Sequence, residues 1–309
     1  MKHLMNHEKH YITFNNYLKN RFHGKVYRVA LNCGFTCPNR DGTKSTKGCL
    51  YCSIKLSGDF AGNINNTLLE QFNEGVAMMS KKWDADHYIA YLQAGTNTYG
   101  KIDYLKELYF NIIKLNPNIK VISIATRPDC ISQEICELLK ELSNYCEVWI
   151  ELGLQTIHEN TQKYLNLQYT TKDFIQSINM LNEYHIKTIV HIINGLPNET
   201  KDMMVETAKF LNQFNLFGLK IHMLHVMKET PLGDIYLKEP FKLLTLDEFV
   251  EISVSQLRYI NTNTIIHRLT GDAPKDLLIE PVWTLKKFVV LNEIDKYMRK
   301  YNIYQGDLC

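Results

Sequence analysis

From residue 25 onward, short apolar runs alternate with longer segments in which apolar residues recur at helical spacing. The runs are nearly continuous, as in strands buried on both faces of a parallel sheet. Six such pairs follow one another, which is the pattern of repeated β-α units. The predicted strands are Val26–Leu31, Tyr88–Gln93, Lys120–Ala125, Val148–Leu154, Thr188–Ile193 and Gly218–Leu224. The predicted helices are Thr67–Lys82, Tyr104–Leu115, Ser132–Leu142, Thr171–Tyr184, Lys201–Phe214 and Leu246–Tyr259.

Polar or glycine-rich residues follow nearly every predicted strand, which distinguishes a barrel from an open sheet. Groups from many strand ends meet at one rim of a barrel, whereas a doubly wound sheet concentrates them at one switch point. We therefore predict an α/β fold, an incomplete (β/α)6 barrel of the TIM type over residues 25–264. Residues 1–24 form a predicted N-terminal extension. Residues 265–309 form a C-terminal one that packs on the barrel and holds a helix near Leu285–Arg299.

Charge is unevenly distributed along the 309 residues, whose net charge is +2. Ten lysines and arginines against Glu8 and Asp41 give residues 1–55 a charge of +8, which leaves −6 for the remainder. A basic segment of this kind indicates a polyanion partner such as a nucleic acid, or else a solvated arm. No apolar stretch approaches the roughly 20 residues needed to cross a membrane, so we expect a cytoplasmic protein without membrane contact.

Three of the eight cysteines, Cys37, Cys49 and Cys52, lie in one loop after the first predicted strand. Thiolates select soft metals, which indicates an iron–sulfur cluster or zinc. Cys33 would complete a four-cysteine zinc set, and the Cys49-x-x-Cys52 pair alone also fits a redox thiol. Three thiolates at a barrel rim favour a cluster that leaves one iron open. The other cysteines, which have no ligand spacing, are Cys130, Cys136, Cys146 and Cys309.

This loop resembles that of the radical S-adenosylmethionine (SAM) enzymes, in which three cysteines follow the first strand and an aromatic residue, here Tyr51, precedes the last. Most of that superfamily has the spacing Cys-x3-Cys-x2-Cys, but this chain has eleven residues between Cys37 and Cys49. The longer spacer resembles the YtqA/YhcC-like branch, which is related to the Elongator catalytic subunit and includes the MnmL-type tRNA wobble-uridine modification enzymes. Further segments that match the branch are residues 93–99, 126–129, 151–156, 194–200 and 267–272.

The resemblance implies the cofactors and the residues that hold them. Cys37, Cys49 and Cys52 would bind a [4Fe–4S] cluster, whose fourth iron binds S-adenosyl-L-methionine, and Cys33 would be a bystander. The implied cofactor-binding residues are Gln93, Gly95, Thr96, Asn97, Arg127, Glu151, Gln155, Ile193, Asn194 and Gly195. For Glu151 a structural ion pair is the alternative, and for the glycine-containing segments a simple turn.

The sequence indicates the substrate-binding residues less specifically than the cofactor-binding ones, and it does not identify a catalytic residue. The candidates near the sixth strand and in the segment after it are Lys220, His222, His267, Arg268 and Asp272. A single histidine on an apolar strand is more often a core residue, which is our interpretation of His225. A surface ion pair explains Arg268 and Asp272 equally well.

The resemblance and the basic segment together predict a radical enzyme acting on tRNA. The branch is linked to wobble uridine, where it would process 5-carboxymethylaminomethyluridine toward 5-aminomethyluridine. A reducing partner such as flavodoxin or ferredoxin is expected, and a tRNA methyltransferase is a further candidate partner. The alternatives are radical chemistry on a small molecule or a protein, and a zinc-stabilised RNA-binding module without activity.

Overall fold

The computed structural model describes residues 9–82 and 84–309 and contains a parallel sheet of seven strands. The strand order is β1-β2-β3-β4-β5-β6-β8, and every neighbouring pair in it is parallel. The seven strands are β1 (Val26–Leu31), β2 (His87–Leu92), β3 (Ile119–Thr126), β4 (Glu147–Gln155), β5 (Lys187–Asn194), β6 (Gly218–Met223) and β8 (Ile265–Arg268). The six predicted strands are therefore confirmed, and β8 adds a seventh from the predicted C-terminal extension.

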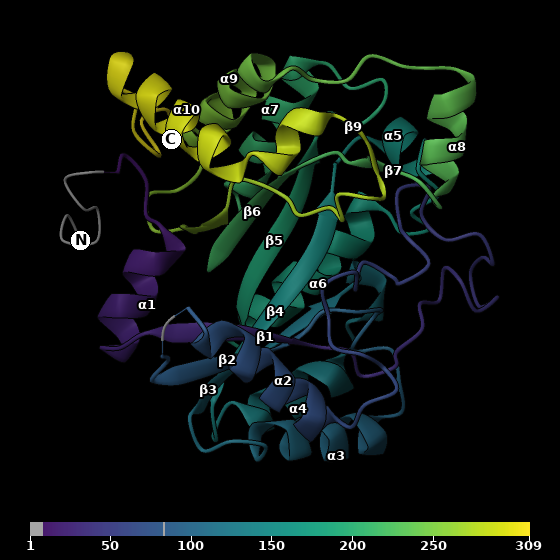
Figure 1. The fold of residues 1–309 in the computed structure, drawn as a ribbon, viewed down its shortest axis with the longest axis vertical. Coiled ribbons are helices and arrows are strands. Elements are labelled where there is room, and N and C mark those ends of the chain that lie inside the picture. The colour runs from purple at the N-terminus through teal and green to yellow at the C-terminus, as the bar shows by residue number, and fades with distance from the viewer. Residues whose placement is uncertain (1–8, 83) are drawn as a thin grey trace.

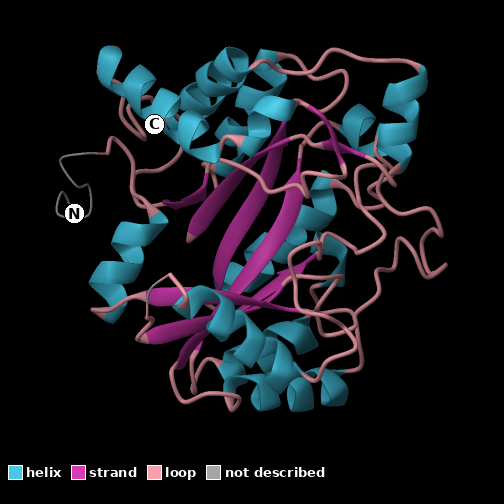
Figure 2. Ribbon diagram, viewed as in Figure 1, coloured by secondary structure: helices cyan, strands magenta, loops and turns pink. Residues whose placement is uncertain are grey.

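The six predicted helices are also present, and further ones lie before, between and after them (Figure 2). The predicted set corresponds to α2 (Leu68–Ser80), α3 (Ile102–Ile113), α4 (Gln133–Leu142), α6 (Thr171–Glu183), α7 (Lys201–Leu211) and α9 (Leu246–Leu257). The additional elements are α1 (Phe14–Phe22), η1 (Pro128–Cys130), α5 (Glu159–Tyr164), α8 (Pro231–Lys238), η2 (Val282–Leu285), α10 (Lys287–Lys300) and the two-stranded sheet of β7 (Val226–Met227) and β9 (Leu278–Glu280). Helix α10 is the helix predicted near Leu285–Arg299.

Three of the sheet-covering helices begin with a capping box, in which a threonine and an acidic residue satisfy each other's backbone amides. These pairs are Thr67 with Glu70, Thr170 with Asp173 and Thr245 with Glu248. Each cap fixes the residue at which its helix begins. The loop between that helix and the element before it therefore has a fixed length.

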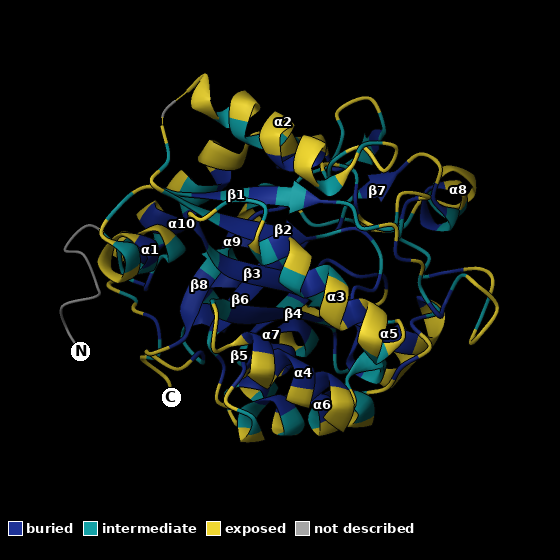
Figure 3. Cartoon of the chain, turned by 90° about the horizontal axis from the view of Figure 1, so that it is seen from below, coloured by how far each residue is buried: buried dark blue, intermediate teal, exposed yellow. Residues whose placement is uncertain are grey.

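The sheet curls instead of lying flat, so that β1 to β3 run across the direction of β5 and β6 (Figure 1). Helices cover its convex face, as the view in Figure 3 shows for α3, α4 and α6. Side chains such as Leu31, Leu92 and Ile124 are fully buried in the core. No pairing joins β1 to β8 in the described part of the chain, so the barrel is incomplete. The predicted fold class is confirmed.

The two ends of the chain pack together beside β8. The backbone N–H of Ile266 donates to the oxygen of Ile12 (2.8 Å), and that of Gln305 donates to the oxygen of His10 (2.9 Å). The rings of His10 and Tyr304 stack with centroids 4.1 Å apart. The described part of the predicted N-terminal extension is therefore packed and is not a solvated arm, while residues 1–8 lie outside the described residues.

The basic first fifth of the chain does not form one patch. Helix α1 and the loop after β1 lie on opposite sides of the molecule (Figure 1). Arg21 is paired with Glu147, and Arg28 points into the barrel beside Glu151. No helix among the described residues has the length and apolar character needed to span a bilayer.

Candidate functional site

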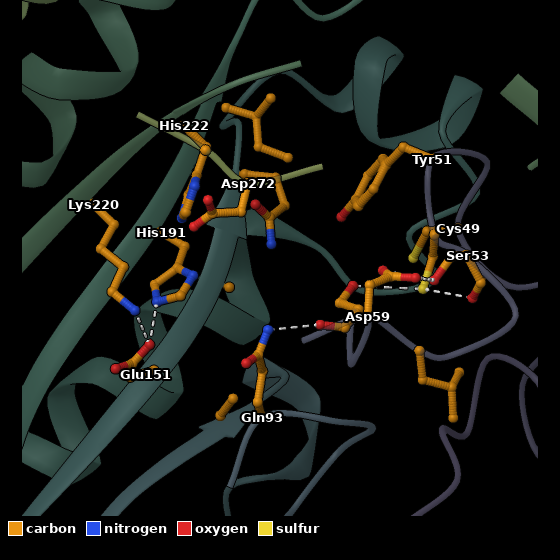
Figure 4. Close-up of a pocket in the computed structure, with 18 of the residues that line it drawn as sticks. Cys49, Tyr51, Ser53, Asp59, Gln93, Glu151, His191, Lys220, His222 and Asp272 are labelled. Carbon is orange, nitrogen blue, oxygen red and sulfur yellow. Dashed lines mark hydrogen bonds and ion pairs between the residues drawn. The ribbon is translucent and has the colours of Figure 1, made fainter. Parts of the chain in front are cut away.

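A cavity of about 430 Å³ opens at the concave side of the sheet, between the strands and the cysteine loop (Figure 4). Residues from each of the strands β1 to β8 line it together with the loop after β1. Most of the residues that the sequence singled out meet here. They are Cys37, Cys49, Cys52, Gln93, Gly95, Thr96, Arg127, Glu151, Gln155, Ile193, Lys220, His222, Arg268 and Asp272.

The long spacer folds back so that its ends lie beside each other. The guanidinium of Arg40 donates to the carbonyl oxygens of Cys52 (2.7 Å) and Ser53 (3.1 Å). Gly48 has a φ of +72°, and a side chain there would meet Arg40, since a Cβ would come within 2.5 Å of its Nε. A glycine is therefore required at this turn. Arg40 thus ties the spacer to the turn that carries Cys49 and Cys52.

Each of the three thiols that line the cavity has a polar nitrogen or hydroxyl group near its sulfur. Nη1 of Arg127 lies 3.9 Å from the Sγ of Cys37, and Nδ2 of Asn39 lies 3.4 Å from that of Cys49. The Sγ of Cys52 is 3.7 Å from the hydroxyl oxygen of Ser57. Donors of this kind stabilise thiolates bound to a metal centre.

Burial favours the protonated thiol at two of these positions, Cys49 and Cys52, in the absence of a bound metal. It raises the pKa of Cys49 to about 12, against the opposing effect of Arg127, and it also raises the pKa of Cys52. The donor set fits a cluster bound by three cysteines.

Cys33 does not line this cavity. It is partly buried against the main core, where burial raises the pKa of its thiol to about 12. Within residues 9–82 and 84–309, no group of three or more His, Cys, Asp or Glu side chains is arranged to hold a single metal ion. A multi-iron cluster spreads its ligands more widely than one ion does. Cys33 therefore lies apart from the cavity that the other three cysteines line, and its interpretation as a bystander stays a prediction.

The opposite side of the cavity holds a buried charge network around Glu151 (Figure 4). The carboxylate of Glu151 is paired with the ammonium of Lys220 and accepts a hydrogen bond from His191 Nε2 (2.9 Å). Its other oxygen accepts from the hydroxyl of Ser123 (2.9 Å) and lies 3.5 Å from Arg28 Nη2. Each partner comes from a different strand, so the network joins β1, β3, β4, β5 and β6.

This environment changes the charge state of several groups. Burial raises the pKa of Glu151, but Lys220 and Arg28 outweigh it and hold that pKa well below its usual value. Burial lowers the pKa of Lys220 to about 7 and that of His191 to about 4. Burial also holds the pKa of His222 well below 6.5, so the two histidines are neutral at neutral pH.

A second group of charges lies at the rim near β8. Nη2 of Arg268 is 2.9 Å from Oδ2 of Asp272, whose other oxygen is paired with Lys287. Arg268 and Asp272 both line the cavity, and Lys287 does not. His225 also lines it, which differs from its interpretation as a core residue.

Four predicted site residues lie away from the cavity lining. The side-chain amide of Asn97 donates to the carbonyl oxygens of Leu92 (3.1 Å) and Ala125 (3.0 Å), so it serves the strand ends. Asn194 donates to Gln256 Oε1 (2.8 Å) inside the core. The N–H of Gly195 points to the sulfur of Met204 (3.3 Å).

His267 is the fourth of these residues. Its ring stacks on Phe14 (4.1 Å between centroids) and packs edge-on to Trp149 and Phe217. Because its side chain points to this aromatic cluster, His267 does not belong to the loop on the open side that the sequence predicts.

The sequence-based prediction missed several lining residues. Arg28 and His191 are polar residues inside apolar strands, and that pattern could have identified them as interior groups. Tyr91 lies under Arg28, with 4.9 Å from the guanidinium carbon to the ring centroid. Phe60 lines the cavity with 54% of its surface exposed, and no pattern in its loop distinguishes it.

Comparisons with known proteins agree with this geometry. A model described as the radical SAM superfamily matches residues 34–211, and one described as the radical SAM C-terminal domain matches residues 217–300. The Bacillus subtilis protein YtqA is 42% identical, over 97% of this chain and 93% of its own length. The tRNA uridine(34) acetyltransferase of Methanocaldococcus jannaschii is 26% identical, over 58% of this chain and 33% of that enzyme.

A solved structure supports the same fold. The structure of Methanocaldococcus infernus Elp3 with an N-terminal deletion superposes with a TM-score of 0.66 at 18% identity. The match covers 91% of this chain and 64% of that one, so this chain spans somewhat less than two thirds of it. The family to which these findings point uses a [4Fe–4S] cluster and S-adenosylmethionine. The chain is an enzyme of the radical SAM superfamily, related to YtqA.

Proposed function

We propose that Cys37, Cys49 and Cys52 hold a [4Fe–4S] cluster in this cavity and that the enzyme acts on the wobble uridine of tRNA. The observation that carries the first part is that these thiols, with polar groups beside them, face the same cavity as the charged strand residues. When bound, the cluster supplies the electron that cleaves S-adenosylmethionine to a 5′-deoxyadenosyl radical. A one-electron donor such as flavodoxin or ferredoxin would have to reduce it.

We propose that the residues between the thiols and the charge network hold the cofactor. The side-chain amide of Gln93 donates a hydrogen bond from Nε2 to the backbone carbonyl oxygen of Ser57 (2.9 Å). Gly95 has a φ of +77°, and a Cβ there would meet the oxygen of Phe35 at 2.3 Å, so the strand end can turn toward the loop only with glycine. Gln155 and Ile193 complete this middle part of the lining. Their role is to orient the cofactor and to exclude water.

Two features support tRNA as the substrate. Relatives named for a tRNA uridine(34) acetyltransferase and for Elp3 share sequence or fold with the chain. Phe60, half exposed at the cavity, is the kind of aromatic surface on which a base splayed from a single-stranded loop stacks. The proposed reaction processes 5-carboxymethylaminomethyluridine toward 5-aminomethyluridine. Since a thiolate-bound cluster requires a reducing compartment, we propose the cytoplasm as the location.

The test compares the nucleosides of bulk tRNA from cells with and without this protein. The proposal predicts that cells lacking the protein accumulate the carboxymethylaminomethyl precursor and lose the aminomethyl product. A matched strain carrying the Cys33→Ala variant should keep the normal profile, while Cys49→Ala should behave like the deletion. An unchanged wobble-uridine profile would contradict tRNA as the substrate and leave a small molecule or a protein in its place.

A further inference from the structure

Two arginines from opposite edges of the sheet face the same end of the cavity. Arg28 belongs to β1 and Arg268 to β8, the strands at the two ends of the sheet, and both line the cavity. Arg28 keeps 22% and Arg268 37% of its side chain exposed. Burial is the main cause that lowers the pKa of Arg268, and the charge of Arg28, which lines the same cavity, lowers it further.

The charges at this end do not balance. Glu151 is shared by Arg28 and Lys220, and Asp272 is shared by Arg268 and Lys287. Four basic side chains share two carboxylates; because burial lowers the pKa of Lys220 to about 7 and leaves it partly protonated, the excess at neutral pH is between one and two positive charges. The neighbouring histidines His191 and His222 are neutral at neutral pH and so do not change that sum. Unpaired charge at a partly buried site is costly, so this end of the cavity favours an anion.

We propose that Arg28 and Arg268, with Lys220 behind them, bind a carboxylate of the substrate. The proposal rests on the proposed function and specifies which chemical group the site recognises. A planar guanidinium matches the two oxygens of a carboxylate. A backbone phosphate has a ribose on either side, which keeps it away from Arg28 and Lys220 beside the buried carboxylate of Glu151. A carboxylate at the tip of a base substituent can extend from the rim at Arg268 toward these groups.

Arg28 lies beside Glu151 and Arg268 beside Asp272. Figure 4 shows Glu151 and Asp272 apart from Cys49. Arg127, in contrast, lies beside Cys37 and is bound by Asp129 through two hydrogen bonds of 2.9 Å. The anion site is therefore separate from the end of the cavity where the cofactor would meet the cluster.

The experiment measures binding of two tRNAs to the reconstituted enzyme in the presence of S-adenosylmethionine. One tRNA carries 5-carboxymethylaminomethyluridine and the other 5-aminomethyluridine at the wobble position. We expect wild type to prefer the first by at least about tenfold, the usual effect of a charge-assisted hydrogen bond. Arg268→Gln and Arg28→Gln should lose that preference, and Arg268→Lys should keep part of it.

Lys287→Gln provides the matched control. Lys287 pairs with the same carboxylate as Arg268 but does not line the cavity, so its removal should leave the preference intact. Removing Arg268 leaves Asp272 paired with Lys287, so the variant should fold, which its thermal unfolding midpoint checks.

The outcomes separate this inference from the proposed function. A preference that persists in folded Arg268→Gln and Arg28→Gln enzymes overturns the carboxylate site and leaves the tRNA assignment standing. A second outcome is an arginine variant that keeps the tRNA preference but binds S-adenosylmethionine at least about tenfold more weakly than wild type. That outcome would show that these arginines bind the carboxylate of the cofactor, and it also overturns the inference. Wild type that binds neither tRNA contradicts the proposed function itself.

Discussion

Arg127 reaches from the end of β3 to the cysteine loop, with its Nη1 atom 3.9 Å from the Sγ of Cys37. Asp129 fixes its guanidinium through two hydrogen bonds, and the ring of Tyr169 lies 5.0 Å from its central carbon. A fixed positive charge beside a bound cluster stabilises the reduced form. Arg127→Gln should therefore make the midpoint potential of the cluster more negative, as measured by a redox titration followed by electron paramagnetic resonance. Arg127→Lys should retain most of the wild-type value, and equal potentials in all three proteins would refute this role.

The cysteine assignment predicts different iron contents for single variants. After anaerobic reconstitution, wild type should hold about four irons per chain, as expected for one [4Fe–4S] cluster. Cys37→Ala, Cys49→Ala and Cys52→Ala should each lose most of that iron and the visible absorption that accompanies it. Cys33→Ala is the control, because Cys33 packs against the core away from the cavity. Loss of the cluster in Cys33→Ala alone would overturn the ligand set.

Removing the carboxylate of Glu151 should destabilise the fold. Glu151→Gln keeps the shape but leaves Lys220 and Arg28 without their shared counter-charge in a buried site. Loss of one partner of a buried pair costs about 3–5 kcal/mol. Urea unfolding should show a decrease of this order in the free energy of unfolding. Glu251→Gln, which breaks an exposed pair with Lys201, should change it little; equal effects would show that the buried network does not stabilise the barrel.

His267 makes stability depend on pH. Burial holds the pKa of its ring well below 6.5, and both ring nitrogens are buried without a hydrogen-bond partner. The unfolded chain takes up a proton near pH 6.5 that the folded chain excludes, so stability from this residue falls as pH drops below about 6.5. His267→Phe should remove this loss, about 1–2 kcal/mol at pH 5 relative to pH 7. The free energy of unfolding is measured by urea unfolding at each pH. If it depends on pH in the same way in wild type and His267→Phe, His267 is not the source of the pH dependence.

Phe60 is predicted to hold the substrate base. Base stacking on an aromatic side chain contributes about 1–3 kcal/mol, so Phe60→Ala should weaken tRNA binding by roughly 5-fold to 100-fold. Phe60→Trp should retain wild-type tRNA binding, since any aromatic face can stack. Phe288→Ala removes a more exposed phenylalanine on α10, 83% exposed and outside the cavity lining, and should leave binding unchanged. If Phe60→Ala binds like wild type, stacking at this position is excluded.

The sequence predicted the parts of the site that depend on local order along the chain. The thiols of Cys37, Cys49 and Cys52 share one loop, and residues such as Gln93 and Glu151 lie on or after strands whose ends converge, so repeated β-α units place them together. Strand β8 was harder, because its four residues are too short to show a period.

The remaining errors concern where side chains point. Asn97 and Asn194 occupy strand ends like true cavity residues, but their amides satisfy other groups inside the protein. Spacing alone cannot distinguish an amide turned inward from one turned to a ligand. Arg28 joins the site through Glu151 on β4, although β2 and β3 lie between their strands, so this contact exists only once the sheet has curled. His191 contacts Glu151 from the neighbouring strand β5, and only its position inside an apolar run could have indicated it.

We infer that the cavity binds a cluster at its cysteine end and a tRNA base beside it. The most direct test incubates the anaerobically reconstituted enzyme with S-adenosylmethionine, a one-electron reductant and tRNA, and quantifies 5′-deoxyadenosine and the wobble nucleoside together. We expect wild type to form 5′-deoxyadenosine as 5-carboxymethylaminomethyluridine is lost, and Cys49→Ala to show neither change. Conversion of the nucleoside by Cys49→Ala, or no cleavage of S-adenosylmethionine by iron-loaded wild type, would contradict it.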